Sequence, residues 1–118
     1  MKAYFFSLVM TKSFQWGGRY KGIIMDPGGT SRTYFSWGLG IASSNRAGAY
    51  ALWQGLKVAK GMGVQYLIVI GDYKTIISHM VHNSKPGDCP LASILDRSRQ
   101  ETNSFISITY YHVLRDLC

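Results

Sequence analysis

Acidic residues are scarce in this chain: 6 Asp and Glu stand against 13 Lys and Arg in 118 residues, which gives a formal net charge of +7. Scarce carboxylates leave few candidates for any metal site that needs several of them. The excess of cations attracts polyanions, and nucleic acid is the commonest polyanion that a basic domain binds. The charge balance therefore points to a nucleic-acid partner, although a basic protein without such a partner fits the charge equally well.

Cysteines are few and are not arranged for a structural role. Cys89 lies in a Pro-rich loop, Cys118 is the last residue, and neither has a neighbour at metal-ligand spacing. Two isolated cysteines make no disulfide framework. We therefore expect a reducing compartment inside the cell, either the nucleus or the cytoplasm.

Long apolar runs are also missing. Residues 3–10, after Lys2, resemble the first part of a signal peptide, but no small-x-small cleavage site follows them. The run is far shorter than the roughly 20 residues of a membrane-spanning helix. Its aromatic and branched side chains favour a buried first strand, and we expect no membrane association.

The remaining composition suits a folded domain, because apolar types make up 47% of the chain and no linker interrupts it. We expect one domain over residues 1–118. Periodicity and turn residues predict strands at 3–10, 19–26, 33–37, 65–70 and 105–113, and helices between 43–45 and Gly61, at 73–81 and at 91–103. The turn Asp26-Pro27-Gly28-Gly29 makes the second and third strands antiparallel neighbours. This order predicts an α/β fold: a mixed five-stranded sheet, with three antiparallel strands followed by α/β crossovers, and helices on its faces.

Four segments of the chain carry recognisable motifs. They are KGIIMDPGG at 21–29, SSNRAGAYAL at 43–52, LIVIGDYK at 67–74 and YHVLR at 111–115. The first looks like a strand followed by a D-P-x-G turn, and the second like a T-N-N-x-A-E-x-x-A-L helix start. The third is similar to a strand-end G-D-S motif and the fourth to an H-V-x-R segment. In this order and at compatible spacing, the four resemble the ribonuclease H superfamily, and most of all its plant reverse-transcriptase-like branch.

The resemblance implies an RNA–DNA hybrid endonuclease, or a domain derived from one, in which four carboxylates hold two magnesium ions. Transferred to this sequence, the strand-one acid falls on or beside Ser7 and the helix acid falls on Gly48, while the third acid is retained as Asp72. The fourth would lie beyond Arg115, where Asp116 is the best substitute. Only oxygen anions hold such a pair of ions, so one retained acid of four predicts that catalysis is lost and that no magnesium binds tightly.

Three of these positions allow more than one interpretation. Gly48 removes a ligand and costs a helix about 1 kcal/mol relative to Ala, with no local gain visible in the sequence. Asp72 is either a remnant metal ligand or the N-cap of the following helix. His112 matches a family position at the rim of the active site, where it assists catalysis, and is otherwise an exposed structural residue.

The resemblance also implies a nucleic-acid surface for RNA–DNA hybrid or double-stranded RNA. The candidate contacts are Asn45, Lys57, Lys60, Lys74 and Lys85. A solvated helix surface explains the same lysines equally well. Trp53 lies beside the apolar stripe of its helix and is either a packing residue or a base-stacking one.

Two other functions stay open at this point. Unrecognised acids would restore an active magnesium-dependent hybrid nuclease, whereas a pseudoenzyme would serve as a protein-interaction module or be a retroelement-derived fragment. The final helix of the family would fall beyond Cys118, which would leave part of the sheet uncovered. A homodimer through that uncovered face is a further expectation.

Overall fold

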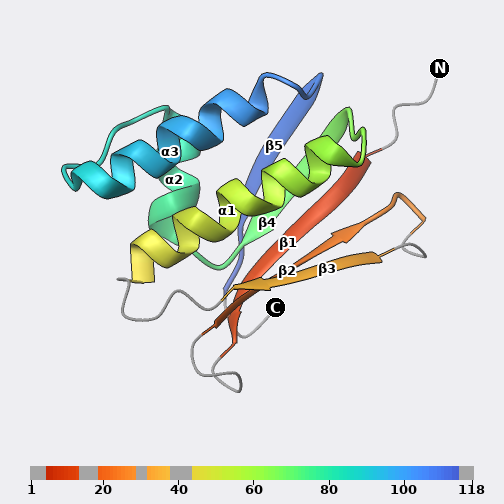
Figure 1. Ribbon diagram of the computed structural model, residues 1–118, viewed down its shortest axis with the longest axis horizontal. Coiled ribbons are helices and arrows are strands. Elements are labelled where there is room, and N and C mark those ends of the chain that lie inside the picture. The colour runs from red at the N-terminus through yellow and green to blue at the C-terminus, as the bar shows by residue number, and fades with distance from the viewer. Residues whose placement is uncertain (1–4, 14–18, 29–31, 38–43, 115–118) are drawn as a thin grey trace.

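The computed structural model describes residues 5–13, 19–28, 32–37 and 44–114, and these residues form strands and helices in the predicted order (Figure 1). The elements are β1 (Phe5–Ser13), β2 (Arg19–Met25), β3 (Arg32–Trp37), α1 (Ser44–Gly61), β4 (Tyr66–Gly71), α2 (Lys74–His82), α3 (Cys89–Thr102) and β5 (Ser107–His112). Among the described residues, no helix is long and apolar enough to cross a membrane.

The sheet has the strand order β3-β2-β1-β4-β5. β1 pairs with β2, and β2 with β3, in antiparallel register, whereas β1–β4 and β4–β5 are parallel pairs. The continuous apolar sequence of β4 is explained by its place between two parallel neighbours. The α/β class with a mixed sheet, which the sequence predicts, is confirmed.

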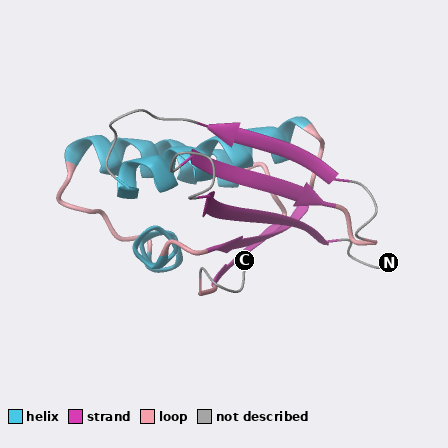
Figure 2. Cartoon of the chain, turned by 90° about the horizontal axis from the view of Figure 1, so that it is seen from below, coloured by secondary structure: helices cyan, strands magenta, loops and turns pink. Residues whose placement is uncertain are grey.

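One face of the sheet carries the core of the domain. Side chains of a strand alternate between its faces, and one row of alternate residues is buried here: Leu8 and Met10 on β1, Ile24 on β2, and Leu67 and Val69 on β4. The buried side chains of all three helices join the same cluster, with Leu52, Leu56, Ile76, Ile77, Leu91 and Leu95 among them. α1 and α3 run side by side over this face (Figures 1 and 2).

Packing of helix α1 on the sheet sets the position of its first turns. Its stripe of Ala49, Leu52, Leu56 and Ala59 is fully buried, as the spacing predicts. The helix ends at Gly61, and Gly63 adopts a φ of 78°, which glycine tolerates without strain. The Val64 N–H donates to the Ala59 carbonyl at 3.2 Å, the closing bond of a Schellman end.

Candidate functional site

The carboxyl ends of β4 and β5 lie beside the second half of β1 at one edge of the sheet. Met10 of β1 pairs with Gly71 of β4, and Gly71 pairs with His112 of β5. Asp72 and Tyr73 follow β4 directly, and the first turns of α1 bring Gly48 to the same cavity. Ligands of open α/β sheets bind at this type of edge. The sequence-predicted residues Gly48, Asp72 and His112 are therefore brought together.

A small cavity lies at this edge, lined by Met10, Gly48, Gly71, Asp72 and Tyr73, with a volume of about 10 Å³. Such a volume holds about one water molecule. Its walls are a thioether, an aromatic ring, two glycines and one carboxylate. The cavity is therefore mostly apolar.

Tyr73 closes the cavity on the side of α1. A β-carbon placed on Gly48 would stand 3.1 Å from Cγ of the Tyr73 ring and 3.2 Å from both Cδ atoms. Contacts this short force one of the two groups to move. The ring thus occupies the space into which any side chain at position 48 would project. The contact with Tyr73 accounts for the lack of a side chain at position 48. The sequence alone did not reveal this contact.

Asp72 lines the cavity, and His112 lies at the end of the neighbouring strand β5, paired with Gly71. Asp72 is half-buried and His112 is exposed, and the Val113 N–H donates to the Gly71 carbonyl at 3.0 Å, which ties the end of β5 to the end of β4. The N-cap residue of α2 is Tyr73, and its side chain makes no capping hydrogen bond. The interpretation of Asp72 as the N-cap is therefore wrong. Asp116 lies outside the described residues.

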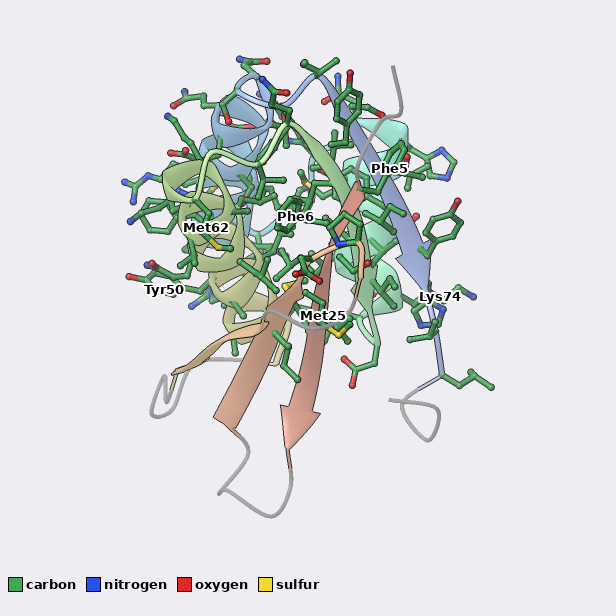
Figure 3. The ribbon with its side chains drawn as sticks, turned by 90° about the vertical axis from the view of Figure 1, so that its right-hand side faces the viewer. Phe5, Phe6, Met25, Tyr50, Met62 and Lys74 are labelled. Carbon is green, nitrogen blue, oxygen red and sulfur yellow. The ribbon has the colours of Figure 1, made fainter. Side chains whose placement is uncertain are left out.

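The predicted nucleic-acid contacts do not form one surface. Lys74 is exposed at the start of α2, close to the cavity, whereas Lys57 and Lys60 lie on α1. Figure 3 shows Lys74 on the opposite side of the molecule from Tyr50, a residue of the outer surface of α1. Asn45 is exposed in the first turn of α1, and Lys85 is exposed in the loop between α2 and α3.

On the outer surface of α1, the lysines have local partners. Lys57 Nζ lies 4.2 Å from the centroid of the Trp53 ring, and Lys60 Nζ lies 3.4 Å from a carboxylate oxygen of Glu101. Arg97 of α3 approaches the same Trp53 ring, at 5.5 Å. The half-buried Trp53 thus packs between the two helices with cations over it, an arrangement that favours its structural interpretation.

One ion pair that the sequence analysis missed joins the starts of α1 and α3. Arg46 Nε and Nη2 donate to the two carboxylate oxygens of Asp88, each at 2.9 Å. The hydrogen bonds from Arg46 hold the pKa of the Asp88 carboxyl below its ordinary value. No local signal marks this pair, because the two residues lie 42 positions apart in the sequence.

Comparison with known protein families identifies the family of this chain. Residues 11–117 match the family described as reverse transcriptase-like, and this match covers most of the chain. The chain belongs to this family of the ribonuclease H superfamily. A comparison with curated proteins finds no match.

Solved structures of ribonucleases H share the fold of this family member. RNase H1 from the archaeon Halobacterium salinarum has a TM-score of 0.79 at 17% identity, with 96% of this chain and 88% of that chain covered. The N-terminal RNase H domain of a Mycobacterium tuberculosis protein has a TM-score of 0.80 at 19% identity, covering 94% and 84%. LC11-RNase H1, isolated from compost by a metagenomic approach and solved in complex with an RNA/DNA hybrid, has a TM-score of 0.73 at 14% identity, covering 97% and 87%.

The structure places Ser7, the expected position of the strand-one acid, away from the cavity. Ser7 pairs with Met25 and Ile68 in the middle of the sheet, and its side chain lies on the face away from the core. Met10, three residues later, pairs with Gly71, is 5% exposed and lines the cavity beside Asp72. Met10, rather than Ser7, is therefore the residue of β1 that lies at the cavity with Asp72. Only the parallel register of β1 and β4 gives this information.

The residues at this edge do not fit a pair of magnesium ions. Magnesium takes oxygen ligands and keeps several waters, and the ions of a two-metal site lie about 3.5–4 Å apart. The cavity holds about 10 Å³, and Asp72 is its one carboxylate. Among the residues that the structure describes, no three His, Cys, Asp or Glu side chains are grouped to hold a metal ion.

Proposed function

We propose that this domain binds RNA–DNA hybrid or double-stranded RNA and has lost the cleavage reaction of related ribonucleases H. The observation that carries the proposal is the Tyr73 ring, which fills the space over Gly48 where a helix carboxylate would project. The fold of a hybrid nuclease is thus retained, while the chemistry that needs anionic ligands is replaced by an apolar contact.

Met10 and Gly48 act together to remove oxygen ligands from the site. A hydroxide-generating metal pair needs several carboxylate oxygens, because each ion keeps open positions for water and substrate. Met10 and Gly48 supply no oxygen ligand, and they line the same cavity as the single carboxylate of Asp72. One anchor cannot hold two dications against their mutual repulsion. These contacts support the proposed loss of cleavage.

Binding of nucleic acid needs only cations and a complementary surface. The net charge of +7 provides the attraction, and LC11-RNase H1, which shares the fold, was solved with a hybrid. We place the contact at the edge that carries Asp72, where Lys74 and His112 are both exposed. Lys57 and Lys60 lie elsewhere and contribute to the long-range field rather than to the contact itself.

A binding titration tests this proposal. Fluorescence anisotropy with labelled hybrid, double-stranded RNA and double-stranded DNA of equal length gives the three affinities, measured between about 50 and 200 mM salt. We expect affinity to fall steeply with salt and to favour the two A-form-like duplexes over DNA. Equal affinity for all three duplexes, or no binding at low salt, would contradict the proposal.

A further inference from the structure

The segment between α2 and α3, residues 83–88, is bound to α3 at its start. We call this segment the α2–α3 loop. Arg99 Nη2 of α3 donates to the Ser84 carbonyl at 2.6 Å and to the His79 carbonyl at 3.2 Å. His79 Nδ1 and Ser84 Oγ also share a hydrogen bond of 2.7 Å. One guanidinium group therefore joins the last turn of α2 to the first residues of the loop.

The guanidinium group of Arg99 is engaged inside the protein. Its Nη1 donates to a carboxylate oxygen of Asp96 at 3.1 Å, and its Nε is buried, with no hydrogen-bond partner among the described residues. The side chain of Arg99 is only 18% exposed. A cation in this position is poorly placed to bind a phosphate directly. Arg99 therefore acts on the loop rather than on a ligand.

The other end of the loop is bound to the helix that carries the candidate site. Asp88, the last residue of the loop, accepts both hydrogen bonds from Arg46, in the first turn of α1. Gly48, two residues further along α1, lines the cavity together with Asp72. In Figure 1, the first turns of α1 and α3 lie at the same end of the molecule. The α2–α3 loop therefore borders the edge at which we place the nucleic acid.

Lys85 is the cation that this loop presents. It is exposed, and within the described chain it forms no ion pair. Lys74 and Lys85 lie at opposite ends of α2, whose nine residues span about 13 Å. Phosphates follow one another about every 3.4 Å along the axis of one strand, so this span corresponds to about four base pairs. One short duplex can therefore reach both lysines.

We propose that Arg99 is a positioning residue for nucleic-acid binding, which holds the α2–α3 loop in the conformation from which Lys85 contacts a phosphate. This role rests on the proposed binding of hybrid or double-stranded RNA. Ordering a loop at the moment of binding costs conformational entropy, and this cost lowers affinity. A loop that is already bound to α3 avoids part of the cost. Loss of Arg99 therefore weakens the contact of Lys85 without removing its cation.

Amide hydrogen exchange of the free protein tests the positioning itself. Arg99→Met keeps a long side chain but donates no hydrogen bond. The Ser84 amide, which donates to the His79 carbonyl at 3.1 Å, should then exchange faster than in the wild type. Arg97→Met is the matched control, because Arg97 is exposed on the same helix and lies over the Trp53 ring instead. It should leave this exchange unchanged. Equal exchange in the wild type and Arg99→Met overturns the proposal.

A double-mutant cycle of hybrid affinity tests whether Arg99 acts through Lys85. Lys85→Ala should weaken binding and reduce the slope of log affinity against log salt by about 1. Arg99→Met should weaken binding by about 3- to 10-fold while Lys85 is present. In the Lys85→Ala background, it should cause no loss beyond that of Arg97→Met, which removes the same charge. An equal loss from Arg99→Met in both backgrounds, or no loss in either, overturns the proposal.

The same titrations separate the role of Arg99 from the proposed function. A wild type that binds no hybrid at low salt contradicts both. A wild type that binds hybrid as tightly as Lys85→Ala contradicts the role of Arg99 alone.

A second variant, Arg99→Lys, covers the case in which Arg99→Met does not fold. It keeps the charge but replaces the planar fork of donors by a compact ammonium group. It should show faster exchange at Ser84 and a smaller loss of affinity, again only while Lys85 is present. A loss that persists in the Lys85→Ala background contradicts the proposal.

Discussion

The ring of Tyr73 lies over Gly48 so closely that a β-carbon at position 48 would stand 3.1 Å from its nearest ring atom. The two residues come from different elements, one from the first turns of α1 and the other from the start of α2. Each therefore limits the choice of residue at the other position. A large ring at position 73 disfavours a side chain at position 48, because the ring would have to shift by a few tenths of an ångström to admit a β-carbon.

This contact predicts a coupling of stability between the two positions. Gly→Ala in a helix interior ordinarily stabilises by about 1 kcal/mol. We expect Gly48→Ala to show none of this gain in the wild type, because the added methyl meets Tyr73, and to show it in a Tyr73→Ala background. Urea unfolding of the four proteins should give a coupling of roughly 1 kcal/mol.

Gly61→Ala is the matched control for this cycle. An added β-carbon at Gly61, the last residue of α1, meets nothing within 4 Å. Its effect on the free energy of unfolding should be the same in the wild type and in the Tyr73→Ala background. If Gly48→Ala stabilises both backgrounds equally, the contact with Tyr73 does not constrain position 48.

Nucleic-acid binding should depend on the lysine nearest the cavity. We expect Lys74→Ala to weaken binding to hybrid and to reduce the slope of log affinity against log salt by about 1, because one phosphate contact is lost. Lys57→Ala removes the same charge from the outer surface of α1, where Lys57 lies over Trp53. It should leave the slope unchanged. A larger change for Lys57→Ala than for Lys74→Ala would move the binding surface to the outer side of α1.

The stability that the Arg46–Asp88 pair contributes should depend on pH. Its hydrogen bonds lower the pKa of Asp88 in the folded state, so the contribution is present above the ordinary Asp value of about 3.9 and is lost as pH falls through the lower, folded value. We expect Arg46→Met to lower the urea midpoint at neutral pH and to match the wild type at about pH 2. Both groups are partly exposed to solvent, so the effect should be small.

Lys57→Met is the control that removes one positive charge without removing an ion pair with a carboxylate. Within the described chain, Lys57 contacts the Trp53 ring rather than a carboxylate. Any difference in urea midpoint between Lys57→Met and the wild type should therefore stay constant across the acid range. A deficit of Arg46→Met that persists at the lowest pH would show that the pair stabilises the fold by packing rather than by charge.

Much of the fold was predictable because its signals are local. The stripe from Ala49 to Ala59 predicts one face of α1, the glycines at 61 and 63 predict its end, and the continuous apolar run of β4 predicts a strand with neighbours on both sides. These features depend on residues within one or two turns of each other, so the sequence alone carries them.

The candidate site was predictable only in part, because it depends on contacts between distant segments. Gly48, Asp72 and His112 were found from motifs, and the structure brings them to one edge. Met10 was missed in favour of Ser7, since the parallel register of β1 and β4 cannot be read from either strand alone. Tyr73 was missed because its partner lies across the fold, on α1.

The absence of hybrid cleavage is the central claim, and a nuclease assay tests it most directly. Purified protein is incubated with labelled RNA–DNA hybrid and magnesium or manganese, beside an Asp72→Asn variant that removes the one carboxylate of the cavity. We expect no cleavage by the wild type above the level of Asp72→Asn. Cleavage by the wild type that Asp72→Asn abolishes would contradict the proposed loss of catalysis.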